Sequence, residues 1–340
     1  MFKKILVPCV AVGVASLLGA ASARADESTK VGGKVYADLT SISAKDAAGN
    51  KTDASGIGYD LKRGYLTFDH GFGDIWSVNV TTDMQYSSAV GATELYIKKA
   101  YLQAKFSDAL VLRAGSTDLP WVPFVEGLYG YRFLENVMVD RGHFGTSADW
   151  GLHLSGKTGG MFNYAVSVVN GAGYKKPLRS KSMDVEGRVS ITPIDGLTVA
   201  AGVYSGKLGK ETQNLSADHT ANRFDALVAY VNNGIRVGAE YFMAKNWNTV
   251  TSVNSDKADG YSVWASYDIN PMWGVFARAD QTKPSKDLSP DTKDQYFNAG
   301  FVAHARKGVD IAVAYKHDKL KQPAGSPKVD EIGVWGQWAF

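Results

Sequence analysis

Apolar and polar residues alternate along most of this chain with the period of two that is typical of β-strands. In the last twelve residues, every second position from Ile332 to Phe340 is apolar, whereas the positions between them include Glu331 and Gln337. Because successive side chains point to opposite faces of a strand, the segment predicts a strand with one apolar and one mixed face.

The same alternation recurs along the chain and predicts sixteen strands, about one for every twenty residues. A strand of about ten residues is long enough to cross a membrane when it is tilted. The predicted strands are 34–42, 58–70, 74–86, 94–106, 109–117, 148–157, 161–170, 182–192, 196–206, 222–231, 234–244, 259–269, 273–283, 293–305, 309–319 and 329–340.

The connections between these strands alternate between short and long. Tight turns such as Gly159-Gly160 and Asn232-Asn233 consist of turn-forming residues, whereas segments such as 43–56 and 207–221 are long and polar. An antiparallel up-and-down barrel with short turns at one end and long loops at the other predicts this alternation. The Greek-key crossings of a soluble sandwich would mix the lengths. The sequence therefore predicts an all-β transmembrane barrel with both termini at its periplasmic end.

Charged residues share one face of each predicted strand. Arg236 and Glu240 alternate with Val237 and Ala239, for example. Charges on a lipid-facing side would cost several kcal/mol near the membrane midplane, so we expect them to face inward. An interior with this many charges must hold water, because unpaired buried charge is too costly.

Aromatic residues gather near the tight turns, as in the interfacial girdle of a membrane barrel. They are Phe68, Phe72, Trp76, Phe106, Phe162, Trp273 and Phe340. A terminal aromatic residue on an alternating strand also resembles the C-terminal end of bacterial outer-membrane β-barrels.

The first residues have the pattern of a cleaved signal peptide. Lys3 and Lys4 precede an apolar run, and Ala23-Arg24-Ala25 is a small-x-small cleavage pattern. We therefore expect residues 1–25 to be a signal peptide and residues 26–340 to form a single barrel domain. Without residues 1–25 the 37 basic residues fall to 34, equal to the 34 acidic ones, so charge does not favour a nucleic-acid partner. Cys9, the single cysteine, is removed as well, which excludes a disulfide framework.

One connection, residues 118–147, is much longer and more aromatic than the others. An exposed loop would not carry so much apolar surface, so we expect it to fold into the lumen and narrow the pore. Its charged residues Arg132, Glu135, Asp140 and Arg141 would then lie at or near the constriction. The alternative is that Arg132–Glu135 and Asp140–Arg141 are pairs that fix the loop to the wall.

This stretch resembles the phosphate-selective porin O/P family of outer-membrane channels. The resemblance lies in Arg113-x-Gly115, Pro120-x-x-Pro123-Phe124, Leu128-Tyr-Gly-Tyr-Arg-Phe133, Asp140-Arg141 and Ala148-Asp149-x-Gly151. It is clearest over about 110–160 and at the C-terminus. The resemblance implies a sixteen-stranded barrel, a homotrimer, and a loop after the fifth strand that folds into each pore.

Anion selectivity in the phosphate-specific members rests on ladders of lumenal Arg and Lys. The lumenal cations predicted here are Lys34, Arg63, Lys99, Lys105, Arg113, Lys157, Arg188, Arg236 and Arg278. Carboxylates such as Asp83, Glu186 and Asp280 share those faces, and the net charge of residues 26–340 is zero. The resemblance therefore does not by itself predict phosphate selectivity.

The sequence thus predicts a bacterial outer-membrane porin for passive diffusion of small hydrophilic solutes or inorganic ions, with phosphate as one candidate. Expected partners are outer-membrane lipids, the permeating solutes and two further copies in a homotrimer; no cofactor or metal is expected. An outer-membrane enzyme or a specific substrate receptor is the alternative. The six histidines are scattered and form no catalytic or metal-binding motif.

Overall fold

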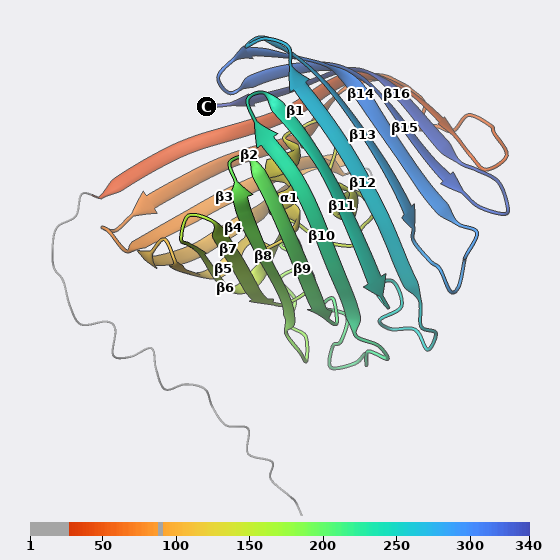
Figure 1. Cartoon of the computed structure of the whole chain (residues 1–340). Helices are drawn as coiled ribbons and strands as arrows, with labels where there is room; N and C mark the ends of the chain where they lie inside the picture. The colour runs from red at the N-terminus through yellow and green to blue at the C-terminus, as the bar shows by residue number, and fades with distance from the viewer. Residues whose placement is uncertain (1–26, 88–90) are drawn as a thin grey trace, which may run out of the picture.

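The computed structural model describes residues 27–87 and 91–340, and the predicted signal peptide lies outside them. Sixteen antiparallel strands follow one another around a closed barrel in chain order, and β1 pairs with β16 to close it (Figure 1). The strands are β1 (Ser28–Lys45), β2 (Gly56–Gly71), β3 (Trp76–Ser87), β4 (Ala92–Ser107), β5 (Leu110–Asp118), β6 (Ala148–Thr158), β7 (Phe162–Val169), β8 (Asp184–Ile194), β9 (Leu197–Gly206), β10 (Ala221–Asn232), β11 (Ile235–Lys245), β12 (Lys257–Asp268), β13 (Trp273–Lys283), β14 (Lys293–Arg306), β15 (Val309–Lys321) and β16 (Lys328–Ala339).

The predicted barrel and each of its sixteen strands are confirmed. The largest difference in bounds is at β1, which begins at Ser28 rather than at residue 34. Its early start follows from its pairing, because Ser28 lies opposite Gly71 at the far end of β2. Gly33 and Phe340 also exchange two backbone hydrogen bonds, of 3.0 and 3.1 Å, which join the two ends of the chain at the closure of the barrel.

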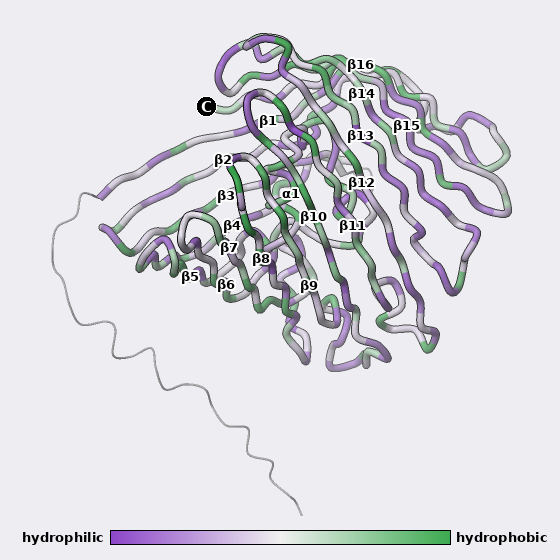
Figure 2. The backbone as a smooth tube through the Cα atoms, in the orientation of Figure 1, coloured by the Kyte–Doolittle hydropathy of each residue, from purple (hydrophilic) through white to green (hydrophobic). Residues whose placement is uncertain are grey.

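The two faces of the wall differ as the alternation predicts. On β12, Val263 is 48% exposed on the outside, whereas Ser262 and Trp264 point inward and are 1% and 5% exposed. Hydrophilic and hydrophobic residues alternate along the strands, and hydrophilic residues predominate in the long loops (Figure 2). An outer face this apolar requires an apolar environment around the barrel. Within the described residues, no helix is long and apolar enough to cross a membrane.

The segment between β5 and β6 folds into the barrel, as predicted (Figure 1). It contains two short helices that the sequence did not predict, α1 (Val122–Tyr129) and α2 (Met138–Arg141). Gly130 ends α1 with a φ of 83°, and its N–H donates to the Glu126 carbonyl at 2.9 Å. We call residues 119–147 the constriction loop.

Two β-bulges place consecutive cations on the inner face of the wall. The register between β1 and β2 shifts by one residue at Lys62, and the register between β3 and β4 shifts at Lys98. A bulge adds one residue to one strand and re-aims its side chain. As a result Lys62 and Arg63 both contact lumenal groups, as do Lys98 and Lys99.

Candidate pore constriction

Side chains of the wall hold the constriction loop by its backbone carbonyls. The Arg188 guanidinium donates to the Pro120 carbonyl at 2.9 Å, Arg278 to the Asn136 carbonyl at 2.6 Å, and Arg223 to the Phe144 carbonyl at 2.6 Å. Other donors of this kind are Lys62 to Leu134, Arg236 to Leu128 and Trp247 to His143. The anchors come from β2, β8, β10, β11, β13 and the loop after β11, so the loop is held along its whole length.

Wall carboxylates accept from the start of the loop. The Trp121 N–H donates to Glu186 at 3.0 Å, and its indole N–H donates to Glu240 at 2.7 Å. Trp121 and Asp225 are fully buried and Glu186 and Glu240 are each 2% exposed. Arg223 bonds both Glu186, at 3.1 Å, and Asp225, at 2.8 Å, so one guanidinium balances two buried carboxylates. Removing one member of such a buried group of charges would leave the others without a counter-charge, which is costly.

Arg141, at the end of α2, anchors the second half of the loop. Its guanidinium lies 3.4 Å from Asp280, 2.7 Å from Asp294 and 2.9 Å from Asp318, which belong to β13, β14 and β15. It also stacks over the Tyr296 ring at 4.6 Å. A planar guanidinium suits this role because its five donors can be shared among several carboxylates.

Glu135 anchors the middle of the loop through Lys316 on β15. The Lys316 ammonium lies 2.9 Å from Glu135 and 2.7 Å from Glu331. Burial by itself raises the pKa of Glu135, but the ammonium groups of Lys316 and Lys62 outweigh it, so the pKa of this carboxyl lies below its ordinary value. Glu135 therefore stays charged, and stays attached to the wall, below the ordinary carboxyl pKa.

The pairs considered from the sequence, Arg132–Glu135 and Asp140–Arg141, are not the pairs of the structure. Arg132 bonds Glu126 at 2.5 Å, within the loop. Asp140 accepts from the Asn136 amide at 2.7 Å. The difference arises because helix α1 brings Glu126 back toward Arg132, whereas Glu135 and Arg141 reach the wall.

Apolar packing completes the attachment of the loop. Phe144 lies against Phe242 with ring centroids 4.8 Å apart, and Tyr131 lies against Phe276 at 4.5 Å. Tyr129 meets Trp264 edge-on at 6.0 Å. The inner faces of β9 to β13 thus form a dry core with the loop. We call the inner face of β8 to β16 the anchored wall.

The inner face of β2 to β6, which we call the free wall, is different. Gln103 and Arg113 are partly exposed, and Asp69, Lys105 and Lys157 are exposed. Arg113 bonds neutral partners, Gln103 at 2.8 Å and Ser155 at 3.4 Å. These lumenal side chains therefore meet water rather than the loop, whereas Lys62 on the same wall reaches the loop and Asp83 and Lys98 are buried.

Cations and tyrosine rings line the free wall near the loop. The Lys98 ammonium lies 4.9 Å from the Tyr65 ring and 5.8 Å from the Tyr174 ring, and Lys175 lies 4.4 Å from the Tyr96 ring. Among the described residues, no carboxylate lies within 4.0 Å of Lys98, Lys175 or Arg113. Arg63, by contrast, bonds Asp83 at 3.0 Å.

The predicted lumenal cations divide between the two walls. Arg188, Arg236 and Arg278 are on the anchored wall and bind the loop. Those on the free wall or at its edge are Lys34, Arg63, Lys99, Lys105, Arg113 and Lys157. Lys99 pairs with Asp118 at 2.5 Å and Lys105 with Asp108 at 2.8 Å.

Sequence reasoning missed Lys62, Lys98, Arg223 and Lys316. The first two lie at bulges, where strict alternation would place one residue of each consecutive pair of cations on the lipid side. Two consecutive cations in one strand were the signal that could have found them. One of the two would face lipid under strict alternation, which is too costly, so a bulge must turn its side chain inward. Lys316 alternates with Tyr315 on β15 and could have been assigned to the lumen from its parity.

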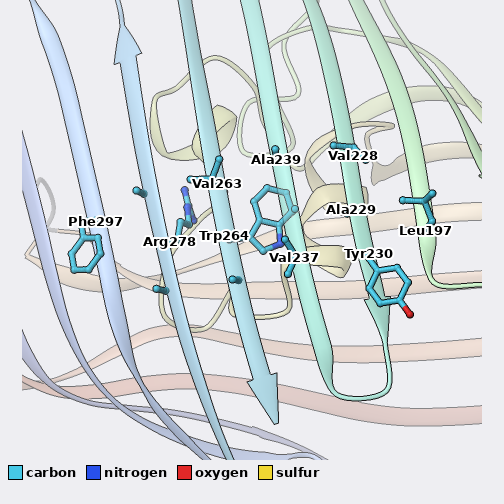
Figure 3. A pocket seen from close by; sticks show the side chains of 14 residues that line it. Leu197, Val228, Ala229, Tyr230, Val237, Ala239, Val263, Trp264, Arg278 and Phe297 are labelled. Carbon is cyan, nitrogen blue, oxygen red and sulfur yellow. The ribbon is translucent and has the colours of Figure 1, made fainter. Parts of the chain in front are cut away.

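An apolar hollow of about 550 Å³ lies on the outside of the barrel, not in the lumen. Outward side chains of Val228, Val237, Val263 and Phe297 border it on β10, β11, β12 and β14 (Figure 3). The hollow forms because Ala239, Ala265, Ala277 and Ala279 have short side chains there. Its lining also includes Trp264 and Arg278, whose side chains contact the constriction loop.

Comparison with protein-family models finds no match, and comparison with curated proteins finds none either. Solved structures do match. An anion-selective porin from Comamonas acidovorans has a TM-score of 0.69 and 14% identity over 93% of this chain and 100% of that one. The outer membrane channel DcaP of Acinetobacter baumannii has a TM-score of 0.67 and 15% identity over 92% and 97%. Salmonella typhi OmpF in complex with daunomycin has a TM-score of 0.63 and 14% identity over 92% and 97%. At these identities the likeness establishes a porin fold.

Proposed function

We propose that this chain is an outer-membrane porin that lets small hydrophilic solutes and ions diffuse passively between the constriction loop and the free wall. The observation that carries the proposal is the anchored loop inside a closed barrel of porin fold. A loop fixed at many points narrows the lumen permanently and needs no chemistry to do so. The apolar outer face supports a location in a membrane.

We further propose a preference for anions. Three buried carboxylates of the lumen, Glu186, Asp225 and Asp280, lie under the loop, where the guanidinium groups of Arg223 and Arg278 neutralise them. Lys98 and Arg113 remain on the free wall, and Lys175 reaches it from the loop after β7; all three lie beside aromatic rings or neutral groups. Fixed charges act on permeating ions through a narrow water column, so these cations would raise the local anion concentration. Phosphate belongs to the anions to test, on the resemblance of residues 110–160.

The expected assembly and orientation complete the proposal. We expect residues 1–25 to be removed, as the cleavage pattern predicts. The resemblance implies a homotrimer. The even number of strands puts both termini at the same end of the barrel, which we propose is the periplasmic end. The long loops would then face the outside of the cell, and the free wall would be reached from both sides of the membrane.

Reconstitution in a planar bilayer tests the proposal. The refolded chain should give stepwise conductance, and in a potassium chloride gradient the reversal potential should shift toward the chloride equilibrium value. Replacing chloride by phosphate on one side then tests whether phosphate permeates. Folded protein that gives no conductance would contradict the channel. A reversal potential shifted toward potassium would contradict the anion preference and leave a general porin.

A further inference from the structure

Eight lysines lie on the outer face of the barrel at the end that carries the long loops. Six of them, on β1 and β13 to β16, form what we call the lysine belt: Lys45, Lys283, Lys293, Lys319, Lys321 and Lys328. Lys245 and Lys257, which are paired in register on β11 and β12, continue the row. Strand parity places them outside. Lys319 and Lys321 lie an even number of residues from Tyr315 and Val313 on β15, so they share the outer face with these residues, which are 40% and 54% exposed.

The belt contains like charges directly opposite one another. Lys293 is paired in register with Lys321, Lys319 with Lys328, and Lys45 also with Lys328. Like charges at such positions destabilise a sheet. In the described part of the chain, only Lys328 of the six has a carboxylate within 4.0 Å, Asp330 at 3.5 Å. The barrel therefore keeps a repulsion that an external anion would relieve.

The opposite side of the same rim has no such belt. The outward positions of β2 to β9 at the loop end carry no lysine among the described residues. Ile57, Tyr59 and Val185 are there instead, with exposed fractions of 80%, 70% and 43%. Among the described residues, outward lysines at the loop end are thus concentrated on seven neighbouring strands, β11 to β16 and β1, and are not a general property of the rim.

We propose that the lysine belt binds the phosphate groups of anionic lipid headgroups in the leaflet at the loop end. The inference rests on the proposed function, since it requires the barrel to be in a membrane. The outer face just below the belt is apolar, with Phe297 and Ile332 exposed, and Phe297 also borders the hollow of Figure 3. A lipid whose chains cover that surface places its phosphate among the ammonium groups, which attract anionic headgroups at close range.

The test measures lipids retained by the refolded full chain. Native mass spectrometry compares phosphatidylglycerol with phosphatidylcholine for the unchanged chain, a belt variant (K293Q/K319Q/K321Q/K328Q) and a control (K51Q/K176Q/K181Q/K210Q) that removes four exposed loop lysines. We expect the unchanged chain and the control to bind phosphatidylglycerol at least tenfold more tightly than phosphatidylcholine. The belt variant should lose that preference, and high salt should weaken it in the others, because salt screens exposed charges.

An equal preference in the belt variant and the control, or no preference in the unchanged chain, would overturn the proposal. If the fourfold variant does not fold, K293Q/K319Q removes two members of the belt and should reduce the preference in part. The belt lies outside the lumen, so single-channel conductance of the belt variant should be unchanged. A chain that retains phosphatidylglycerol but gives no conductance would contradict the channel function and leave the lipid site standing.

Discussion

The anchored wall and the free wall contain the same residue types, but their arginines have different roles. On the anchored wall, Arg188, Arg223 and Arg278 are buried and donate to loop carbonyls. On the free wall, Arg113 is partly exposed and bonds only neutral side chains among the described residues. A lumenal arginine is therefore a structural clamp or a charge offered to solutes according to whether the constriction loop covers it.

Removing a clamp should have the largest effect. In Arg141→Ala, Asp280 keeps Arg278, whereas Asp294 and Asp318 lose the guanidinium beside them. Breaking a buried ion pair from one side costs about 3–5 kcal/mol. We expect a lower unfolding temperature, and a larger and noisier single-channel conductance because the second half of the loop is released. Arg113→Ala is the matched control on the free wall and should leave the loop in place. A stable Arg141→Ala channel with unchanged conductance would contradict the role of this anchor.

Reversing a charge on the free wall should change selectivity but not the loop. Lys98→Glu replaces a cation that lies between two tyrosine rings with an anion. Two unit charges 4 Å apart interact with an energy of about 1 kcal/mol even in water. Reversing the charge beside a permeating ion should therefore lower the anion-to-cation permeability ratio several-fold. The reversal potential in a salt gradient measures this. Arg278→Gln, on the anchored wall, should alter stability far more than selectivity, and the opposite ranking of the two variants would contradict the division of the lumen.

A conservative change at the start of the loop should have a small effect. Glu240 accepts from the Trp121 indole through one oxygen, and its other oxygen is buried and has no hydrogen-bond partner among the described residues. Glu240→Gln keeps the acceptor and removes a buried charge, so the unfolding free energy should be equal or higher. Trp121→Phe leaves the buried Glu240 carboxyl without this bond and should cost about 1–3 kcal/mol. Denaturant unfolding of both variants tests this, and a Glu240→Gln variant less stable than Trp121→Phe would contradict it.

The smallest effect is expected at the turn end. Lys105 and Asp108 form a pair at 2.8 Å whose side chains are 49% and 84% exposed. Exposed pairs contribute about 0–1 kcal/mol, so Lys105→Gln should change neither the unfolding temperature nor the conductance measurably. A clear change in selectivity in this variant would extend the selectivity region to the turn end of the free wall.

Much of the fold was predictable because it follows from alternation and from turn chemistry. The apolar set of β11, with Val237 and Ala239 outside and Arg236 and Glu240 inside, is apparent in the sequence, and so is the aromatic loop after β5. Each of these signals is local, within one strand or one connection.

The partners within the lumen were not predictable in the same way. Arg141 meets Asp280, Asp294 and Asp318 only because helix α2 ends against three strands far away in the chain. The bulges at Lys62 and Lys98 break the period of two, so their residues fall outside any strict alternation. Which lumenal cations are clamps depends on the path of the loop, and that path is set by packing around the whole barrel.

Cysteine accessibility tests the division of the lumen most directly. Residues 26–340 contain no cysteine, so one new cysteine is placed in this chain at Gln103 on the free wall or at Ser262 on the anchored wall, where the serine is 1% exposed. A charged methanethiosulfonate reagent is added during single-channel recording. We predict a rapid stepwise fall in current for Gln103→Cys and no change for Ser262→Cys. Equal block at both positions, or block at Ser262→Cys alone, would contradict the account that ions pass along β2 to β6 while the loop seals the opposite wall.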